Sequence, residues 1–276
     1  MRGALMAGAC LGLLGGGALG QTIIAYDTAD NAAYDSGWAD DSNGGFGFGG
    51  WTFASSVSDG YAGRFIANET NDGPSNVLNG DPGRAWALYA NNGSGTEQSA
   101  AFRGFDAAIG GAGTMLEIAM ESGFIGTGGR VGVSLRTGNA DGSYADVDTG
   151  AVTQVYFEGG DANFTVLDAL GEHDTGAGFG FDGIVARFMF TGGGMFDLQI
   201  DRYYNESGDY DTFTVSGLTL GGSGVVESIA LFSDDGGDGG GLNNDVYFNN
   251  LTITVPAPGA AAALMVAGFV GVRRRR

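Results

Sequence analysis

The segment between residues 234 and 245 holds the densest group of side chains that could bind a metal ion. Its carboxylates and amides alternate with glycines, and the oxygen donors are Asp234, Asp235, Asp238, Asn243 and Asp245. Ca²⁺ prefers oxygen ligands from carboxylates, amides and turn carbonyls, so this composition predicts a calcium site. The same residue types favour solvated turns, so a metal-free acidic hairpin loop is the alternative. The segment is not an EF-hand loop, because the glutamate at the twelfth position is missing.

A second candidate site is the glycine- and aromatic-rich segment from Ala33 to Trp51. Glycines between large rings let the rings fold back onto a sheet, which predicts that Trp38, Phe46, Phe48 and Trp51 fill one end of a hydrophobic core. The alternative is an exposed ring platform that stacks on sugars, in which Trp38, Trp51 and Trp86 would bind the ligand. Burial of these three indoles distinguishes the two alternatives.

Residues suited to catalysis are sparse. His173 is the only histidine, and its glycine-rich, polar surroundings predict a solvent-facing turn. The only cysteine is Cys10, and the chain has no lysine, so zinc sites with the usual ligands and Schiff-base chemistry are excluded. Paired carboxylates for glycoside hydrolysis stay open, with Glu117, Glu121 and Glu158 the first to examine. We expect these three glutamates on solvent faces and assign no catalytic residue.

The charge balance limits the class of partner. All 12 basic residues are arginines, against 32 acidic residues. Without Arg2 and the four terminal arginines, 12 − 5 leaves 7 positive charges against 32 negative ones, a balance of about −25. Such a surface repels nucleic acid and anionic lipid and favours cations and hydration. We therefore exclude nucleic acid as a partner.

The elements that must position these side chains are strands. Short apolar runs alternate with period two, most clearly at 114–120, 130–136 and 195–200. Glycine, asparagine and aspartate separate the runs, and no amphipathic helix is evident. We predict an all-β fold of roughly a dozen strands, an antiparallel β-sandwich with jelly-roll topology. Further strand candidates are 22–26, 50–54, 62–67, 85–90, 100–105, 152–157, 163–167, 183–190, 212–220, 226–232 and 245–254.

The last of these strands predicts a local irregularity. Val246 and Phe248 share one parity, whereas Leu251 and Ile253 share the other. A regular strand would turn one apolar pair toward water, so we predict a β-bulge at residues 249–250.

The N-terminus has the composition of a secretory signal peptide. Met1-Arg2 is a minimal positive region, residues 4–14 are apolar, and residues 18–20 form a small-x-small cleavage site. We therefore predict a signal helix over residues 1–20 and a β-sandwich domain over residues 21–254. Cleavage after Gly20 would leave the mature chain without cysteine.

Residues 255–276 have a three-part layout. A Pro-x-Pro segment precedes an apolar run at 260–272 and four arginines. Thirteen residues rise only about 20 Å as a helix, short of the roughly 30 Å of membrane hydrocarbon. This helix would lodge only marginally in a bilayer, with the arginines on the cytoplasmic side. A plain C-terminal membrane anchor is the alternative to a processed sorting signal.

This layout resembles the PEP-CTERM sorting signal of Gram-negative bacteria, with Ala257 where the family usually has glutamate. The resemblance implies recognition and cleavage by an exosortase during export to the cell surface or exopolysaccharide matrix, with transient anchoring in the inner membrane. The residues that carry it are Val255, Pro256, Ala257, Pro258, Arg273, Arg274, Arg275 and Arg276.

Three further segments resemble exported PEP-CTERM proteins of unknown function. They are an "AY…GW…NGGxGF…W" run at 33–51, a "GxAWALYA" strand at 83–90 and a closing "YFNNL" strand at 247–251. The resemblance covers most of the mature chain and implies no established activity. We expect an exported, non-catalytic surface or matrix protein whose partner is extracellular polysaccharide. The alternative is a secreted carbohydrate-active enzyme, a glycoside hydrolase or lyase, on a jelly-roll scaffold.

Overall fold

The computed structural model describes residues 20–68, 83–91, 96–138, 142–180, 182–204, 208–235 and 244–257. The chain divides into a main unit, Ile23–Val255, and a terminal unit of Met1–Thr22 and Pro256–Arg276. The predicted signal helix, the C-terminal apolar helix, Pro258 and the four terminal arginines lie outside the described residues. Within the described ranges, no helix has the length and apolarity that a membrane crossing requires.

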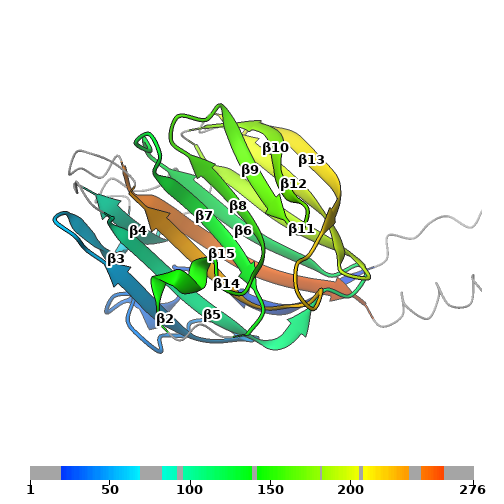
Figure 1. Ribbon diagram of the computed structural model, residues 1–276. Helices are drawn as coiled ribbons and strands as arrows, with labels where there is room; N and C mark the ends of the chain where they lie inside the picture. Colours follow the sequence, from blue (N-terminus) through cyan, green and yellow to red (C-terminus); the bar gives the residue numbers. More distant parts are fainter. Residues whose placement is uncertain are drawn as a thin grey trace, which may run out of the picture. The chain divides into compact units, whose positions relative to one another are not determined.

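The described residues form fifteen strands and two short 3-10 helices, η1 (Ala32–Tyr34) and η2 (Tyr144–Val147). The strands make two antiparallel sheets that pack face to face (Figure 1). Sheet A has the order β13-β12-β11-β6-β15-β4-β3, with β1 beside β15, and sheet B has the order β10-β9-β8-β7-β14-β5-β2. The predicted all-β class is therefore confirmed.

The bounds of the strands follow the predicted runs closely. Sheet A contains β1 (Gln21–Asp27), β3 (Tyr61–Ala67), β4 (Ala85–Asn91), β6 (Met115–Ser122), β11 (Ile184–Gly192), β12 (Met195–Tyr203), β13 (Tyr210–Thr219) and β15 (Val246–Pro256). Sheet B contains β2 (Phe48–Ser56), β5 (Gln98–Ile109), β7 (Arg130–Arg136), β8 (Ala151–Glu158), β9 (Asn163–Asp168), β10 (Gly171–Gly178) and β14 (Val226–Asp234).

The core lies between the sheets because alternate side chains of each strand point inward. In β11, Ile184, Ala186 and Phe188 are buried, and the residues between them are half-buried. Strand β7 is buried on both faces, because the segment that contains η2 covers the outer side of sheet B. The hydroxyl of Ser134 on β7 donates to the carbonyl oxygen of Val147 at 2.8 Å.

The predicted β-bulge in β15 is confirmed. Asn249 and Thr252 pair with residues of β6 that are only two positions apart, so β15 carries one extra residue. Asn250 takes a φ of 56°, in the left-handed region that asparagine tolerates. As a result, Phe248 and Leu251 are both buried in the core.

The prediction that His173 lies in a turn is wrong. His173 belongs to β10 and pairs with Val166 of β9, and its Nε2 lies 3.0 Å from a carboxylate oxygen of Asp168. Strand β10 is an edge strand rich in glycine and polar residues, so it lacks the apolar alternation that marked the other strands. Its hairpin pairing with β9 determines its conformation.

Candidate functional site

The side chain of Asn249, at the bulge of β15, connects segments that are far apart in the sequence. Its Oδ1 accepts hydrogen bonds from the backbone N–H of Ala29 and the hydroxyl of Thr28, both at 2.9 Å. Its Nδ2 donates to the carbonyl oxygen of Arg84 at 2.7 Å. The bulge therefore brings the "YFNNL" strand, the loop after β1 and the start of β4 to one place, as bulges that redirect a side chain do.

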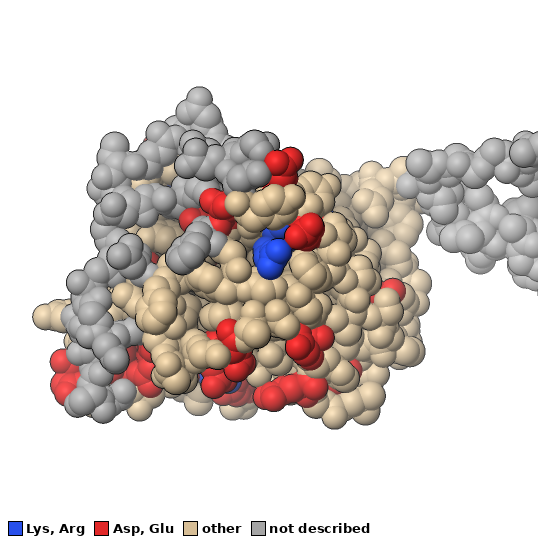
Figure 2. Space-filling view, turned by 90° about the horizontal axis from the view of Figure 1, so that it is seen from above, with Lys and Arg blue, Asp and Glu red and all other residues tan. Residues whose placement is uncertain are grey.

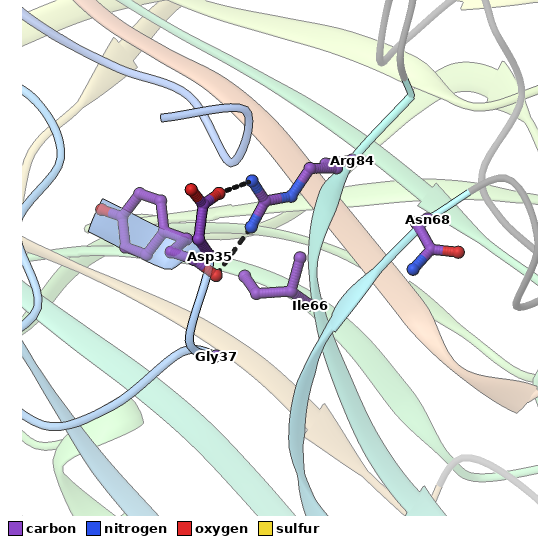
Figure 3. Close-up of a pocket in the computed structure, with 6 residues that line it drawn as sticks. Asp35, Gly37, Ile66, Asn68 and Arg84 are labelled. Carbon is purple, nitrogen blue, oxygen red and sulfur yellow. Dashed lines mark hydrogen bonds and ion pairs between the residues drawn. The ribbon is translucent and has the colours of Figure 1, made fainter. Parts of the chain in front are cut away.

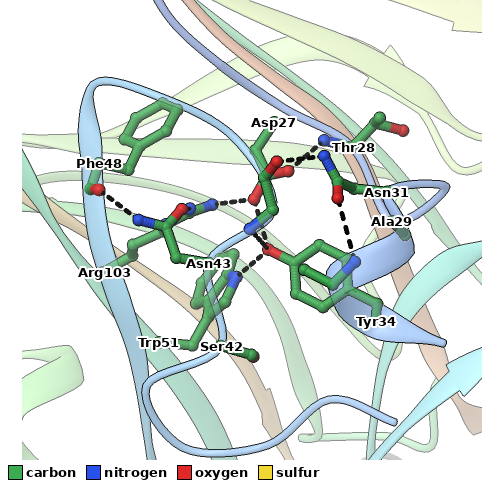
Figure 4. A network of polar contacts seen from close by, with 12 residues as sticks. Asp27, Thr28, Ala29, Asn31, Tyr34, Ser42, Asn43, Phe48, Trp51 and Arg103 are labelled. Carbon is green, nitrogen blue, oxygen red and sulfur yellow. Dashed lines mark hydrogen bonds and ion pairs between the residues drawn. The ribbon is translucent and has the colours of Figure 1, made fainter. Parts of the chain in front are cut away.

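A buried polar network fixes the loop between β1 and β2 (Figure 4). Asp27 forms a fully buried ion pair with Arg103, with 2.5 Å between Oδ2 and Nη1, and accepts a hydrogen bond from the Tyr34 hydroxyl. That hydroxyl in turn accepts from the indole N–H of Trp51 at 3.1 Å. Arg103 also donates to the side-chain oxygen of Asn43. Each buried charge thus has a partner of opposite charge and further hydrogen bonds, which buried ions require.

The ionisation of Tyr34 reflects this environment. Burial raises the pKa of Tyr34 to about 12, against the lowering effect of the nearby Arg103 guanidinium. The phenol is therefore neutral at physiological pH, and it serves as a hydrogen-bonding link between Asp27 and Trp51.

Next to this network lies a surface pocket of about 420 Å³ (Figure 3). The pocket is lined by residues of η1 and of the loop after it, by residues at the end of β3 and by the residue before β4. Ile66 is the one aliphatic side chain among its lining residues. The lining residues are Tyr34, Asp35, Gly37, Ile66, Asn68 and Arg84.

The Arg84 side chain is held in one orientation at the pocket. Its Nη1 forms an ion pair with Asp35 at 2.8 Å, and its Nη2 donates to the carbonyl oxygen of Tyr34 at 2.6 Å. Its backbone N–H donates to a carboxylate oxygen of Asp30 at 3.3 Å. The Asp35 side chain is 67% exposed and that of Arg84 is 17% exposed. The carboxylate of the pair therefore faces solvent, while the guanidinium is held by its hydrogen bond to the Tyr34 carbonyl. The pocket therefore presents N–H donors and a carboxylate acceptor side by side.

The three tryptophans are core residues, and the exposed ring platform predicted as their alternative role is wrong. Phe48 is also in the core, but the prediction that Phe46 lies there is wrong, because its side chain is 55% exposed. Trp38 is 5% exposed, and Trp51 and Trp86 are fully buried. Trp51 packs edge-to-face on both other indoles, with ring centroids 5.1 and 5.2 Å apart. Trp86 also contacts the ring of Tyr34 at 5.7 Å. The indoles thus support the pocket from behind Tyr34 and present no free face to a ligand.

The first two predicted calcium ligands have partners within the protein. A carboxylate oxygen of Asp234, at the end of β14, lies 3.4 Å from Nη2 of Arg130. Burial raises the pKa of Asp234, while hydrogen bonds and the arginine oppose this shift. Asp235 accepts a hydrogen bond from the backbone N–H of Glu97 at 2.8 Å. The guanidinium of Arg130 thus supplies the positive charge that a metal would bring to Asp234.

Asp245 precedes β15 of sheet A, where it accepts a hydrogen bond from the side-chain amide of Asn91 at 3.1 Å. Burial raises the pKa of Asp245 to about 7. Asp238 and Asn243 lie outside the described residues. Among the residues that are described, no group of three or more acidic, histidine or cysteine side chains could hold a metal ion, and the calcium site stays a prediction.

The three glutamates considered for hydrolysis are not brought together. Glu117 and Glu121 lie on β6 of sheet A, whereas Glu158 ends β8 of sheet B, opposite Arg130. Glu117 pairs with Nε of Arg187 at 2.5 Å.

Sequence reasoning missed the pairing of Arg84 with Asp35. Arg84 lies in the segment 83–90 and Asp35 in the segment 33–51, both of which resemble exported PEP-CTERM proteins, but the two residues are 49 positions apart in the sequence. The opposite charges of these two residues were the only sequence signal that could have suggested the ion pair. Composition and periodicity do not reveal which distant segments meet, so the pair emerged only from the structure.

No family model matches the chain, and no curated protein matches it at a significant level. Solved structures with a similar chain path include a legume lectin-like domain from Entamoeba histolytica, with 12% identity over 74% of this chain and 87% of that chain and a TM-score of 0.39. A second is a β-1,3-glucanase from Mycobacterium marinum, with 16% identity over 74% of this chain and 90% of that chain and a TM-score of 0.40. A third is a protein of unknown function from Shewanella oneidensis, with 9% identity over 86% of this chain and 88% of that chain and a TM-score of 0.45. At these scores the similarities assign neither a family nor an activity to this chain.

Proposed function

We propose that this chain is an exported, non-catalytic protein of the cell surface or exopolysaccharide matrix that binds carbohydrate, on a jelly-roll-like sandwich. The observation that carries the proposal is the pocket of about 420 Å³ with the Arg84–Asp35 pair at its wall. Sugar hydroxyls donate and accept hydrogen bonds, so neighbouring hydroxyls match a neighbouring donor and acceptor. Because the protein already holds these groups in place, binding loses little side-chain entropy.

The negative charge of the protein surface favours uncharged carbohydrates as ligands. The chain has 32 acidic residues against 12 arginines, and acidic side chains are spread over the face seen in Figure 2 with little basic surface between them. A polyanion such as a uronate-rich polysaccharide would be repelled by this field. A neutral glycan is not affected in this way.

Export and sorting are a separate part of the proposal and rest on the sequence patterns at the two ends. We expect removal of residues 1–20, transient anchoring in the inner membrane through the C-terminal apolar helix, and cleavage by an exosortase near Pro256 and Pro258. Mass spectrometry of the protein from cell fractions tests this. The expected product starts near Gln21, lacks the four terminal arginines and is found outside the cytoplasm. Intact chain in the cytosol would contradict export.

A glycan array probed with the purified protein tests the carbohydrate proposal. Binding to neutral glycans that weakens in the Asp35→Asn variant supports the pocket. A parallel array with a calcium chelator asks whether the predicted calcium site contributes. An array on which the wild-type protein binds no glycan would leave only a structural role in the matrix.

A hydrolase is the second candidate, and one observation favours it. Carboxylate oxygens of Asp234 and Asp148 lie 3.4 and 4.0 Å from the same nitrogen of Arg130, so they cannot be more than about 7 Å apart. Glycosidase carboxylates are separated by about 5 to 10 Å, and the acid member has a raised pKa, as Asp234 does. Release of reducing ends from an arrayed glycan, abolished in Asp234→Asn, would establish the enzyme and overturn the non-catalytic proposal.

A further inference from the structure

Two tyrosines form an exposed aromatic surface at the far edge of sheet A from the pocket. Tyr203 of β12 and Tyr210 of β13 are directly paired across the strands, with ring centroids 5.2 Å apart and planes inclined by 46°. Tyr210 is 50% exposed and Tyr203 is half-buried. The backbone N–H of Tyr203 donates to the carbonyl oxygen of Gly183 at 2.9 Å, which fixes this end of β12. We call these two residues the tyrosine platform.

A row of polar side chains continues from the platform across the neighbouring strands. Asp201, two residues before Tyr203 and therefore on the same face, accepts hydrogen bonds from Thr212 at 2.7 Å and from Gln199 at 3.1 Å. Its other oxygen pairs with Nη1 of Arg187. The Nε of that arginine pairs with Glu117 at 2.5 Å. We call these five residues the polar strip.

The strip spans β13, β12, β11 and β6, which are neighbours in sheet A. Three interstrand spacings correspond to about 14 Å. The side chain of Asp201 is only 5% exposed and holds Thr212, Gln199 and Arg187 by hydrogen bonds and an ion pair. A ligand would therefore meet these outer side chains in an ordered state. Two carboxylates and one guanidinium give the strip a net charge of −1, which disfavours a polyanion.

The combination of rings and polar side chains suits a saccharide chain. A pyranose has C–H groups on its faces and hydroxyls around its rim, while a tyrosine ring offers an apolar face with a polar tip. Rings at one end of an ordered row of hydroxyl, amide, carboxylate and guanidinium groups can therefore contact successive sugars of a chain. The buried tryptophans cannot provide such a surface.

We propose that the tyrosine platform and the polar strip form a second contact surface, for an uncharged polysaccharide chain. The inference rests on the proposed function in that the ligand is again carbohydrate, and it adds that the ligand is a polymer. Strand β12 is separated from β4 by β11, β6 and β15, so the platform and the pocket lie on the order of 20 Å apart. The two surfaces also face different sides of sheet A, because Ile66 packs against the core between the sheets whereas Arg187 and Glu117 alternate with core residues, so each surface would bind carbohydrate independently.

Affinity electrophoresis of the full chain in gels containing neutral β-glucan, galactan or mannan tests the inference. We expect the Tyr203→Ala, Tyr210→Ala double variant to bind the retarding polysaccharide at least tenfold more weakly than wild type. Tyr203→Phe, Tyr210→Phe should retain most of the binding, because it keeps the rings. Tyr61→Ala is the matched control, since Tyr61 is 65% exposed at the start of β3 on the opposite edge of sheet A. Matching circular dichroism spectra establish that the variants fold.

The outcomes separate the inference from the pocket proposal. Retention of wild-type affinity within twofold by the double alanine variant, together with weakened binding by Arg84→Ala, overturns the platform and leaves the pocket. The reverse pattern supports the platform and overturns the pocket. If wild type is retarded by no neutral polysaccharide, or only by anionic ones, both proposals are wrong.

Discussion

Replacing Asp245 with asparagine should stabilise the protein at neutral and alkaline pH. Asp245 is buried, its pKa is raised from 3.8 to about 7 by burial, and its hydrogen bond from Asn91 offsets only part of that effect. Raising the folded-state pKa of a carboxyl means that the folded state resists its ionisation. Stability from this group is therefore fully present below the unfolded pKa near 4 and is lost as pH rises through about 7.

The magnitude follows from the size of the shift. A difference of about 3 pKa units at 1.36 kcal/mol per unit corresponds to about 4 kcal/mol. Asparagine cannot ionise, and its side-chain oxygen still accepts from Asn91. Within the described residues, the side-chain oxygen of Asn91 has no hydrogen-bond partner, and the new amide would supply a donor near it. We expect equal stability of variant and wild type below about pH 3 and an advantage of about 4 kcal/mol for the variant at pH 8.5.

Urea denaturation followed by tryptophan fluorescence measures this difference, because all three indoles are buried. The quantity to compare is the free energy of unfolding of the variant minus that of wild type at each pH, which cancels the titration of other carboxylates. Asp40→Asn is the control, since its side chain is 69% exposed and loses little hydration on folding. Parallel pH profiles for Asp245→Asn and wild type, or a less stable variant at pH 8.5, would refute the reasoning.

Three further predictions concern the groups around the pocket and the acidic loop. Asn249→Ala should lower the free energy of unfolding in urea by at least about 2 kcal/mol, because it leaves the Ala29 N–H and the Arg84 carbonyl without their partner. A loss below about 0.5 kcal/mol would show that the hydrogen bonds of Asn249 are dispensable. Asp27→Asn should cost about 3 to 5 kcal/mol, since Arg103 would remain buried without its counter-charge, and a smaller loss in Asp27→Leu, Arg103→Met would separate the unpaired charge from lost packing. Millimolar calcium should raise the thermal midpoint of wild type but not of Asp245→Asn if Asp245 is a calcium ligand, and equal responses would exclude it from the site.

Much of the fold was predictable because a strand half-buried in a sandwich shows its orientation in the sequence. Alternation of apolar residues predicts β6, β7 and β12, and a break in parity predicts the bulge in β15. Strand β10 was missed because an edge strand built of glycine and polar residues needs no apolar face.

The candidate site was less predictable because it depends on which segments meet. Asp234 and Asp245 are close in sequence, yet Asp234 ends β14 of sheet B, Asp245 precedes β15 of sheet A, and the two take different partners. Arg84 and Asp35 are distant in sequence and meet through a loop fixed by Asp27, Tyr34 and Arg103. Parity predicts the face on which a residue lies, but strand order and long-range hydrogen bonds decide its neighbours.

The most direct measurement of the central claim is the affinity for a neutral oligosaccharide of two matched arginine variants. Arg84 and Arg64 each pair with an exposed aspartate and each donate to a backbone carbonyl, but only Arg84 lines the pocket. Calorimetric titration should show at least a tenfold loss of affinity for Arg84→Ala and wild-type affinity for Arg64→Ala. Equal affinities in the two variants would contradict carbohydrate binding at this pocket.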